Sequence, residues 1–340
     1  MHQKTKIKRY FLLLSVAVVV LFIANISFGS VQIPFTAVLN ALSGGSNNST
    51  WDYIILAYRL PKAITAIFVG MGLSVSGLLM QTLFRNPLAG PYVLGLSSGS
   101  SLGVALVVMG AGVLPIEFAA LAQSPYSLIL ASCIGSFAVL LAILAVAHKI
   151  KDTMALLVVG LMFGSFSSAI VAVLSYFSSA EALQKFTFWS LGSLGNLTWN
   201  NILLVGSCVA IGILISIYTI KALDALLLGE NYAKTVGIQF TQTKYLLIIA
   251  TAILAGSITA FVGPIAFIGL AVPHLAKLLF QTSQHKIIFI ATLLIGSALL
   301  LLCDILTQLP GTSFYLPINA ITSLIGAPIV IWLLVKKQRF

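Results

Sequence analysis

The chain consists of long apolar runs separated by short polar segments. The runs do not alternate with a period of two, and most are long enough to form helices of about 20 residues, which cross a hydrocarbon core of about 30 Å. The pattern predicts ten spans, at residues 10–27, 61–84, 94–113, 124–147, 154–177, 199–220, 243–261, 264–281, 286–307 and 317–335. At Gly263 and Pro264 the sequence leaves open whether the chain bends inside the membrane or leaves it.

Composition supports a membrane protein and adds no soluble domain. Hydrophobic residues make up 59% of the 340 residues, charged residues 7%, and the mean hydropathy is +1.10. A soluble domain of this size could not bury so much apolar surface, whereas lipid solvates it directly. We therefore expect an all-α, polytopic membrane protein with a single domain over residues 1–340. Its one sizeable cytoplasmic loop is predicted at about residues 221–243.

The basic residues fix a predicted orientation. With the N-terminus inside, 15 of the 18 Lys and Arg residues lie on the inner side. The other three, Arg59, Lys62 and Lys185, lie outside, which is the asymmetry that the positive-inside rule requires. Orientation in the membrane explains the net charge of +11 without a nucleic-acid partner. The prediction is a multi-pass protein of the cell membrane with both termini in the cytoplasm and a retained first helix.

Several chemistries are disfavoured by the residues present. The three cysteines lie in apolar spans without metal-site spacing, and no His has an acidic partner at an obvious spacing. The Gly95–Gly99 stretch matches the G-x-S-x-G pattern, but it begins a membrane helix instead of following a strand. No Gly is followed by Lys, so the P-loop is absent and the chain is expected to bind no ATP or other cofactor itself. An intramembrane serine hydrolase using Ser97 stays as a remote alternative.

Acidic residues are scarce, which bears on the source of energy. Of seven acids, only Asp304 lies in a predicted span, near its outer end. Ion-coupled transporters usually carry carboxylates or other polar groups near the middle of the membrane. Energy is therefore expected to come from another protein. An ion-coupled secondary transporter stays as the main alternative.

Small and hydroxylated residues recur within the spans. Rows such as Ala66, Gly70 and Ser74 allow close helix packing, which is the simpler interpretation for most of them. The fifth span differs because several serines surround it. Their hydroxyls can bond to backbone carbonyls or line a wet path. The candidate pathway residues, on the fifth and tenth spans, are Ser165, Ser168, Asn319, Thr322 and Ser323.

The inner loop has the composition of a docking surface. Residues 226–237 are predicted to form two short helical turns bracketed by Gly229 and Gly237, with leucines and charges mixed. An apolar patch that faces water is more often a binding surface than a plain loop.

Four stretches together resemble permeases of the FecCD-type family, which import iron-siderophores, haem and cobalamin as parts of ATP-driven (ABC) transporters. They occur in the family's order and spacing. The stretches are RLPKAITAIFVGMGLSVSGLLMQTLFRNPLAGPYVLGLSSGSSLG from Arg59, LLLGENYAKTVGI from Leu226, GPIAFIGLAVPHLAKLL from Gly263 and LPINAITSLIGAPIVIWLL from Leu316.

The resemblance implies a type II ABC importer fold and a set of partners. A second permease chain, identical or not, would complete a pathway that works by alternating access. Two ATPase subunits carrying ATP and Mg²⁺ would bind inside, and a substrate-binding protein outside. Arg59 and Lys62 match the basic pair that meets the binding protein, although lysines and arginines at this depth also snorkel to the interface. The coupling segment that would press on the ATPase includes Leu228, Gly229, Glu230, Ala233, Lys234 and Gly237.

This chain departs from the family pattern at four places. Gly90 and Gln284 stand where the family often has acids, and Gln308 stands where some members have an outer Arg. Residues 315–319 read YLPIN instead of ELPVG. These changes weaken inference about partner and substrate but not about fold. Siderophore, haem and cobalamin importers share the motifs, so the sequence does not name the chelate.

Overall fold

The computed structural model describes residues 2–29, 31, 33–44, 49–110, 124–150, 152–195, 197–308 and 315–337. The elements in chain order are α1 (His2–Ser27), α2 (Phe35–Ser43), α3 (Ser49–Tyr53), η1 (Ile54–Arg59), α4 (Leu60–Leu83), η2 (Pro91–Leu94), α5 (Leu96–Gly110), α7 (Pro125–Lys149), α8 (Thr153–Tyr176), α9 (Ala180–Ser190), α10 (Trp199–Tyr218), α11 (Ile220–Leu227), α12 (Glu230–Thr235), α13 (Phe240–Thr251), η4 (Ala252–Gly256), α14 (Ser257–Val262), α15 (Ile268–Phe280), α16 (His285–Thr307) and α17 (Ile318–Lys337).

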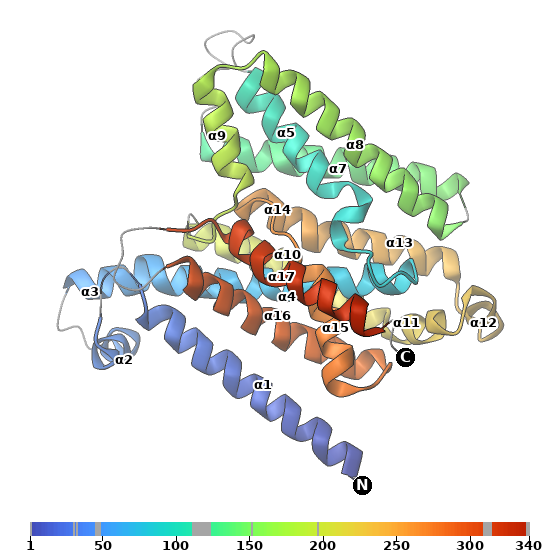
Figure 1. The fold of residues 1–340 in the computed structure, drawn as a ribbon, viewed down its shortest axis with the longest axis horizontal. Coiled ribbons are helices and arrows are strands. Elements are labelled where there is room, and N and C mark those ends of the chain that lie inside the picture. Colours follow the sequence, from blue (N-terminus) through green and yellow to red (C-terminus); the bar gives the residue numbers. More distant parts are fainter. Residues whose placement is uncertain are drawn as a thin grey trace.

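The predicted all-α class and the number of about ten apolar helices are confirmed. Seven helical segments of the described chain are long and apolar enough to cross a membrane, and three shorter apolar helices bring the total to ten. Each matches one predicted span. Within the described residues, extended pairing is limited to an isolated bridge between Gln308 and Tyr315. The helices run roughly side by side, with α2 and α3 at one end and α12 at the other (Figure 1). The start of α1 and the end of α17 lie toward the α12 end (Figure 1).

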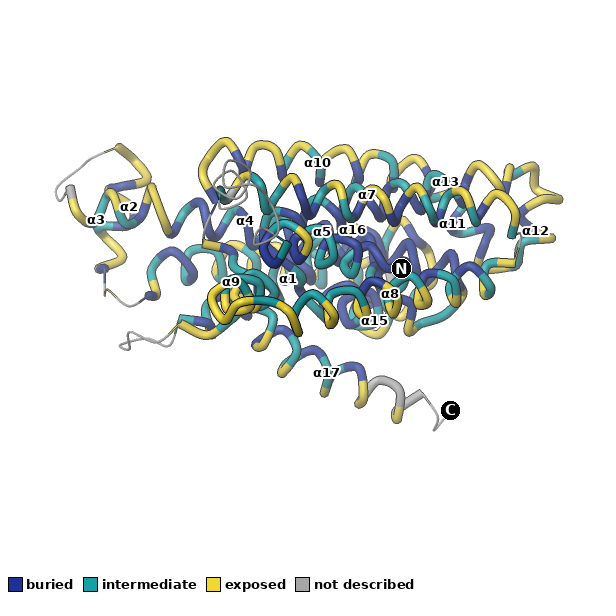
Figure 2. Tube along the Cα trace, turned by 90° about the horizontal axis from the view of Figure 1, so that it is seen from above, coloured by how far each residue is buried: buried dark blue, intermediate teal, exposed yellow. Residues whose placement is uncertain are grey.

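The helices pack in two groups, of which the first surrounds α4. In the first group, α4 packs most extensively on α16, and also on α15, α10 and α13, while α1 packs on α16. In the second group, α5 packs on α7 and α8. Figure 1 shows α5, α8 and α9 on one side of the molecule, and α7 and α5 pack on η4 and α14 of the first group. Almost all of α4 is buried, whereas α8, α10 and α17 carry many exposed apolar side chains, as lipid-facing or partner-facing helices do (Figure 2).

Small residues make these close packings possible. A Cβ built on Gly70 would lie 2.3 Å from the carbonyl oxygen of Gly296 on α16. A Cβ on Gly77 would lie 1.7 Å from the carbonyl oxygen of Gly269 on α15. In the second group, a Cβ on Gly103 of α5 would lie 2.1 Å from the Ala131 oxygen on α7. The small-residue rows therefore serve packing, as the simpler interpretation held.

A short non-helical break, residues 263–267, separates the seventh and eighth spans. Phe240–Val262 is one continuous helical segment, but α15 has only 13 residues. At 1.5 Å per residue α15 is about 20 Å long, less than a core of about 30 Å. A single helix of this length is too short to cross such a core, so α15 differs from the longer spans.

Replacing Gly77 by alanine should separate α4 from α15. The new methyl group meets backbone, which cannot rotate away, so we expect a loss of stability of at least ~1–3 kcal/mol, as for overpacked cores. Thermal unfolding of the purified protein in detergent measures it. Gly90→Ala is the control, because the nearest heavy atom to a Cβ there is 4.0 Å away. Equal melting temperatures for the two variants would contradict this packing.

Candidate functional site

The proposed coupling segment, residues 226–237, comprises the end of α11 and the whole of α12, at one end of the molecule. Gly229 and Gly237 have φ of +117° and +86°, conformations that L side chains rarely adopt, and they bracket α12 as predicted. Glu230 and Lys234 pair across one turn at 2.8 Å. Ala233 is buried and anchors α12 to the body of the protein.

The outer surface of this segment is apolar. Leu228 is 66% exposed and Val236 58%, and Leu227 and Tyr232 are also exposed. They lie next to the polar residues of α12, at the end of the molecule that carries the predicted inner loops. This combination supports a docking face for another protein.

Two polar contacts connect the coupling segment to the helix bundle. Asp224 Oδ1 accepts hydrogen bonds from His285 N and lies 2.8 Å from His285 Nδ1. Lys244 Nζ donates to the carbonyl oxygen of Ala147 at 2.7 Å. The sequence shows no acidic partner for any histidine at an obvious spacing, and His285 acquires one only through the fold. Asp224 is 61 residues away from His285 in the chain. Its carboxylate lies next to Gln284, the position at which the family often has an acidic residue.

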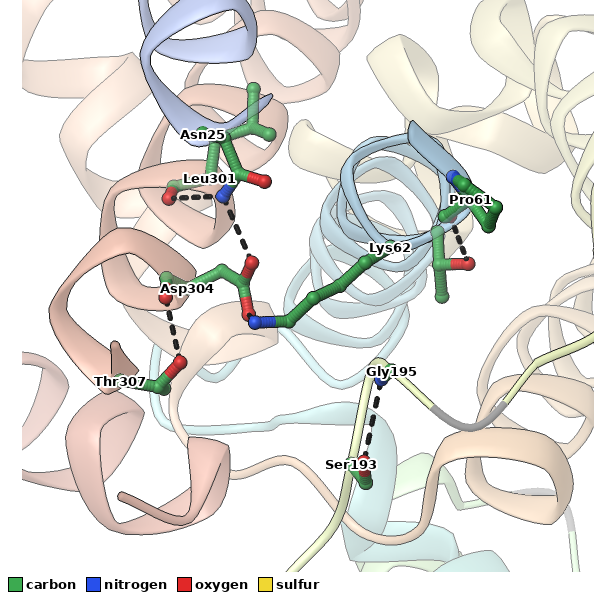
Figure 3. Close-up of polar contacts among 9 residues, drawn as sticks. Asn25, Pro61, Lys62, Ser193, Gly195, Leu301, Asp304 and Thr307 are labelled. Carbon is green, nitrogen blue, oxygen red and sulfur yellow. Dashed lines mark hydrogen bonds and ion pairs between the residues drawn. The ribbon is translucent and has the colours of Figure 1, made fainter. Parts of the chain in front are cut away.

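At the opposite end, Lys62 lies in a buried polar cluster. Its Nζ is 2.9 Å from Asp304 Oδ1, and Asn25 Nδ2 donates to Asp304 Oδ2 at 2.9 Å (Figure 3). The Lys62 ammonium also lies 4.8 Å from the centre of the Tyr315 ring. The cluster joins α1, α4 and α16, and Asp304 is fully buried. The one carboxylate predicted inside a span is therefore neutralised within the chain.

Arg59 is also occupied within the chain. Its Nη1 donates to the carbonyl oxygens of Ile26 at 2.9 Å and Ser27 at 2.7 Å, and its Nη2 donates to that of Val31. These carbonyls lie at and just beyond the end of α1, where helical partners run out. Arg59 and Lys62 are each 6% exposed, so neither projects freely from this face. Their role in docking stays a prediction.

The candidate pathway residues fall into two sets. Ser165 and Ser168 lie exposed on α8, with Ser165 Oγ bonded to the Leu161 carbonyl oxygen at 3.1 Å. On α17, Ser323 is half-buried, whereas Thr322 is 1% exposed and its hydroxyl donates to the Asn319 carbonyl oxygen. Helices α8, α9 and α17 lie along the same side of the molecule, opposite α10 (Figure 2). The structure thus places helices α8 and α17 on one side of the molecule, and no described hydrogen bond joins the two sets of residues.

Asn319 has a partner that the sequence did not indicate. Its Oδ1 accepts from Ala266 N at 3.0 Å, in the break between α14 and α15. The Tyr92 hydroxyl donates to the Ile265 carbonyl oxygen at 2.5 Å and accepts from Ile265 N at 3.2 Å. Tyr92 and Asn319 therefore satisfy backbone groups of the break that lipid could not. Tyr92 was missed, because only the position of η2 beside the break reveals its role.

The order of these features along the chain matches one family throughout. The model of the FecCD transport family matches residues 17–336. The chain belongs to the FecCD transport family. Its resemblance to this family is thereby confirmed. Membership makes this FecCD protein a translocation subunit and not a hydrolase.

Curated relatives cover almost the whole of this FecCD protein. It is 33% identical over 326 residues to the hemin transport system permease protein HmuU of Yersinia pestis, and these residues are 96% of this chain and 95% of HmuU. It is 35% identical over 341 residues to the vitamin B12 import system permease protein BtuC of Vibrio parahaemolyticus, with 99% and 97% covered.

Solved structures show the same fold. A metal-chelate type ABC transporter in an inward-facing conformation superposes with a TM-score of 0.84 at 27% identity, over 97% of this chain and 99% of that one. PsaBC from Streptococcus pneumoniae, in complex with Fab, superposes with a TM-score of 0.51 at 18% identity, over 87% and 95%. The second likeness concerns the fold alone.

Removing Lys62 should test whether the outer cluster is structural. Lys62→Met leaves the Asp304 carboxylate buried without its cation, which should cost ~3–5 kcal/mol of stability. Lys62→Met combined with Asp304→Leu removes both charges and should recover most of that loss. Thermal unfolding in detergent compares the three proteins. A single variant as stable as the wild type would contradict the buried ion pair.

Proposed function

We propose that this protein is the translocation subunit of an ATP-driven importer for a large metal chelate such as haem, cobalamin or an iron-siderophore. The family match over residues 17–336 carries the proposal. The substrates named for HmuU and BtuC support this class of cargo. The chain has no P-loop, so ATP and Mg²⁺ belong to a separate ATPase.

The ATPase binds the α12 end in this proposal. Leu228, Gly229, Glu230, Ala233, Lys234 and Gly237 form the coupling segment, and its exposed leucine, tyrosine and valine side chains supply the contact. The charge asymmetry of the sequence puts this end, and both termini, in the cytoplasm. The protein then spans the cell membrane ten times.

A second permease chain completes the pathway. Helices α8 and α17 lie on one side of the molecule and expose apolar residues between their serines, among them Phe166 at 64% and Leu324 at 70%. A copy or a related chain placed against this side would enclose Ser165, Ser168, Asn319, Thr322 and Ser323 between two subunits. Of these, Ser165, Ser168 and Ser323 are accessible now, and Asn319 and Thr322 would act by holding α17.

A substrate-binding protein docks at the opposite end. Arg59 and Lys62 are the proposed contacts, and both would have to exchange the partners they have within the chain for acids of the binding protein. The stable Lys62→Met/Asp304→Leu variant separates the two roles of Lys62. Loss of binding-protein capture by this variant supports docking through Lys62, whereas full capture contradicts it.

Uptake into proteoliposomes tests the transport function. The permease is reconstituted with an ATPase subunit and a binding protein from the same organism, and haemin, cyanocobalamin and a ferric hydroxamate are supplied in turn. ATP-dependent uptake of at least one chelate is expected. Uptake that needs only an ion gradient and no ATPase would support the secondary-transporter alternative. Esterase activity lost in Ser97→Ala would support the hydrolase.

Leu228→Asp should weaken binding of the ATPase. A charge placed in the apolar contact should reduce the amount of ATPase that copurifies by about tenfold or more, as for a central interface residue. Quantitative pull-down from membranes measures it. Leu183→Asp on α9, toward the other end of the molecule, is the matched control, since Leu183 is 41% exposed. If both variants retain the ATPase equally, α11–α12 is not the docking face.

A further inference from the structure

The coupling segment is attached to the bundle by two side chains of opposite charge. Asp224 lies on α11, just before the exposed part of the segment, and Lys244 lies on α13, just after it. The proposed docking surface of the ATPase lies between them. Each side chain reaches a helix that is distant in sequence, and each reaches the end of that helix.

Asp224 holds the beginning of α16. Its Oδ1 accepts from the backbone N–H of His285, the first residue of α16, at 2.8 Å. The same oxygen lies 2.8 Å from His285 Nδ1, and His285 Nε2 lies 3.0 Å from Thr82 Oγ1 on α4. A carboxylate is favourable at a helix N-terminus, where N–H groups lack helical partners. His285 is fully buried, so one carboxylate links α11 to both α16 and α4.

Lys244 holds the end of α7. Its Nζ donates to the carbonyl oxygens of Ala147 at 2.7 Å and Ile150 at 3.3 Å. The side chain is buried, at 4% exposure, and next to it the Tyr245 hydroxyl lies 3.4 Å from His148 Nδ1. An ammonium group is favourable at a helix C-terminus, where carbonyl groups lack helical partners.

The two attachment points belong to different packing groups. Helix α16 packs on α4 and α1, whereas α7 packs on α5, and α5 packs in turn on α8. Figure 1 shows these groups as separate layers, with α11 and α12 at one end of the molecule. Asp224 therefore joins α11 to the first group. Lys244 lies on α13, which follows α12 and packs on α4, so its contact with α7 joins the first group to the second.

We propose that Asp224 and Lys244 are positioning residues that convert movement of α11–α12 into a relative movement of the α4–α16 group and the α5–α7–α8 group. This inference rests on the proposed function, because it needs an ATPase that moves α12. The competing explanation is that both side chains only cap helix ends. Capping predicts a less stable protein whose response to nucleotide is unchanged. We call the contacts of Asp224 with α16 and of Lys244 with α7 the clamp. If the clamp transmits movement, variants that lack either contact bind the ATPase but no longer transmit its movement.

The test measures a distance between the two groups. Spin labels are placed at Tyr58, in η1 before α4, and at Tyr176, the last residue of α8, which are 55% and 83% exposed. The three native cysteines are replaced by alanine. The permease–ATPase complex is compared without nucleotide and with ATP and orthovanadate by pulsed electron paramagnetic resonance. The wild-type pair should change its distance on addition of nucleotide.

In Asp224→Ala and in Lys244→Met, the fraction of complexes that reaches the nucleotide-induced distance should fall about fivefold or more, the lower end of typical coupling between sites. The ATPase should still copurify. Asp224→Glu and Lys244→Arg should restore the change, because each keeps the charge and the donor or acceptor.

Two variants serve as matched controls. Asp152 caps the N-terminus of α8 through Met154 N at 2.9 Å, so Asp152→Ala removes a cap outside the clamp. Lys149 is exposed in the last turn of α7, so Lys149→Met removes a charge from the same helix end. Both should respond to nucleotide as the wild type does.

The outcomes separate the clamp from the proposed function. Wild-type protein that never retains an ATPase contradicts the proposed function itself. A full nucleotide response in assembled Asp224→Ala and Lys244→Met overturns the clamp alone. If these variants do not assemble, Thr82→Val decides, since it removes the hydroxyl beside His285 and leaves the α16 cap intact. An unchanged response in Thr82→Val then overturns the link to α4.

Discussion

Water is absent from the core of a bilayer, so every helix end or break below the surface must be satisfied by the chain itself. Side chains satisfy several helix ends and the break after α14 in this FecCD protein. Arg59 receives the carbonyls at the end of α1, and Lys244 those at the end of α7. Asp224 meets the first N–H of α16, and Tyr92 and Asn319 meet the backbone of the break after α14. The charged side chains of Arg59, Lys244 and Asp224 thus bind backbone groups at helix ends.

The spans were predictable from the sequence because hydropathy and helix length act locally. Each of the ten apolar runs is long enough to predict its own helix. The coupling segment was predictable for a similar reason, since Gly229 and Gly237 mark the ends of α12 within a few residues. The motifs beginning at Arg59 and Gly263 then identified the family.

The partners of the polar residues could not be predicted from the sequence. Lys62 and Asp304, or Asn25 and Asp304, meet only because α1, α4 and α16 pack against one another, and nothing in their spacing records that packing. Sequence reasoning therefore placed Arg59 and Lys62 at the outer end and treated them as available for docking. It also assigned Asn319 to the pathway, whereas its side chain holds the break at Ala266.

Charged residues are scarce in the spans, which makes the spans easy to recognise. For the same reason, each buried charge has a large effect on how the helices are held together. A cap supplied by water leaves a helix end unattached, whereas a cap supplied by a side chain of another helix joins the two helices. The chain therefore uses fixed side chains from neighbouring helices as caps, and each cap becomes a rigid connection between two helices. Where the capped helices lie in different packing groups, as α16 and α7 do, the connections that satisfy the backbone also transmit force between the coupling segment and the membrane helices.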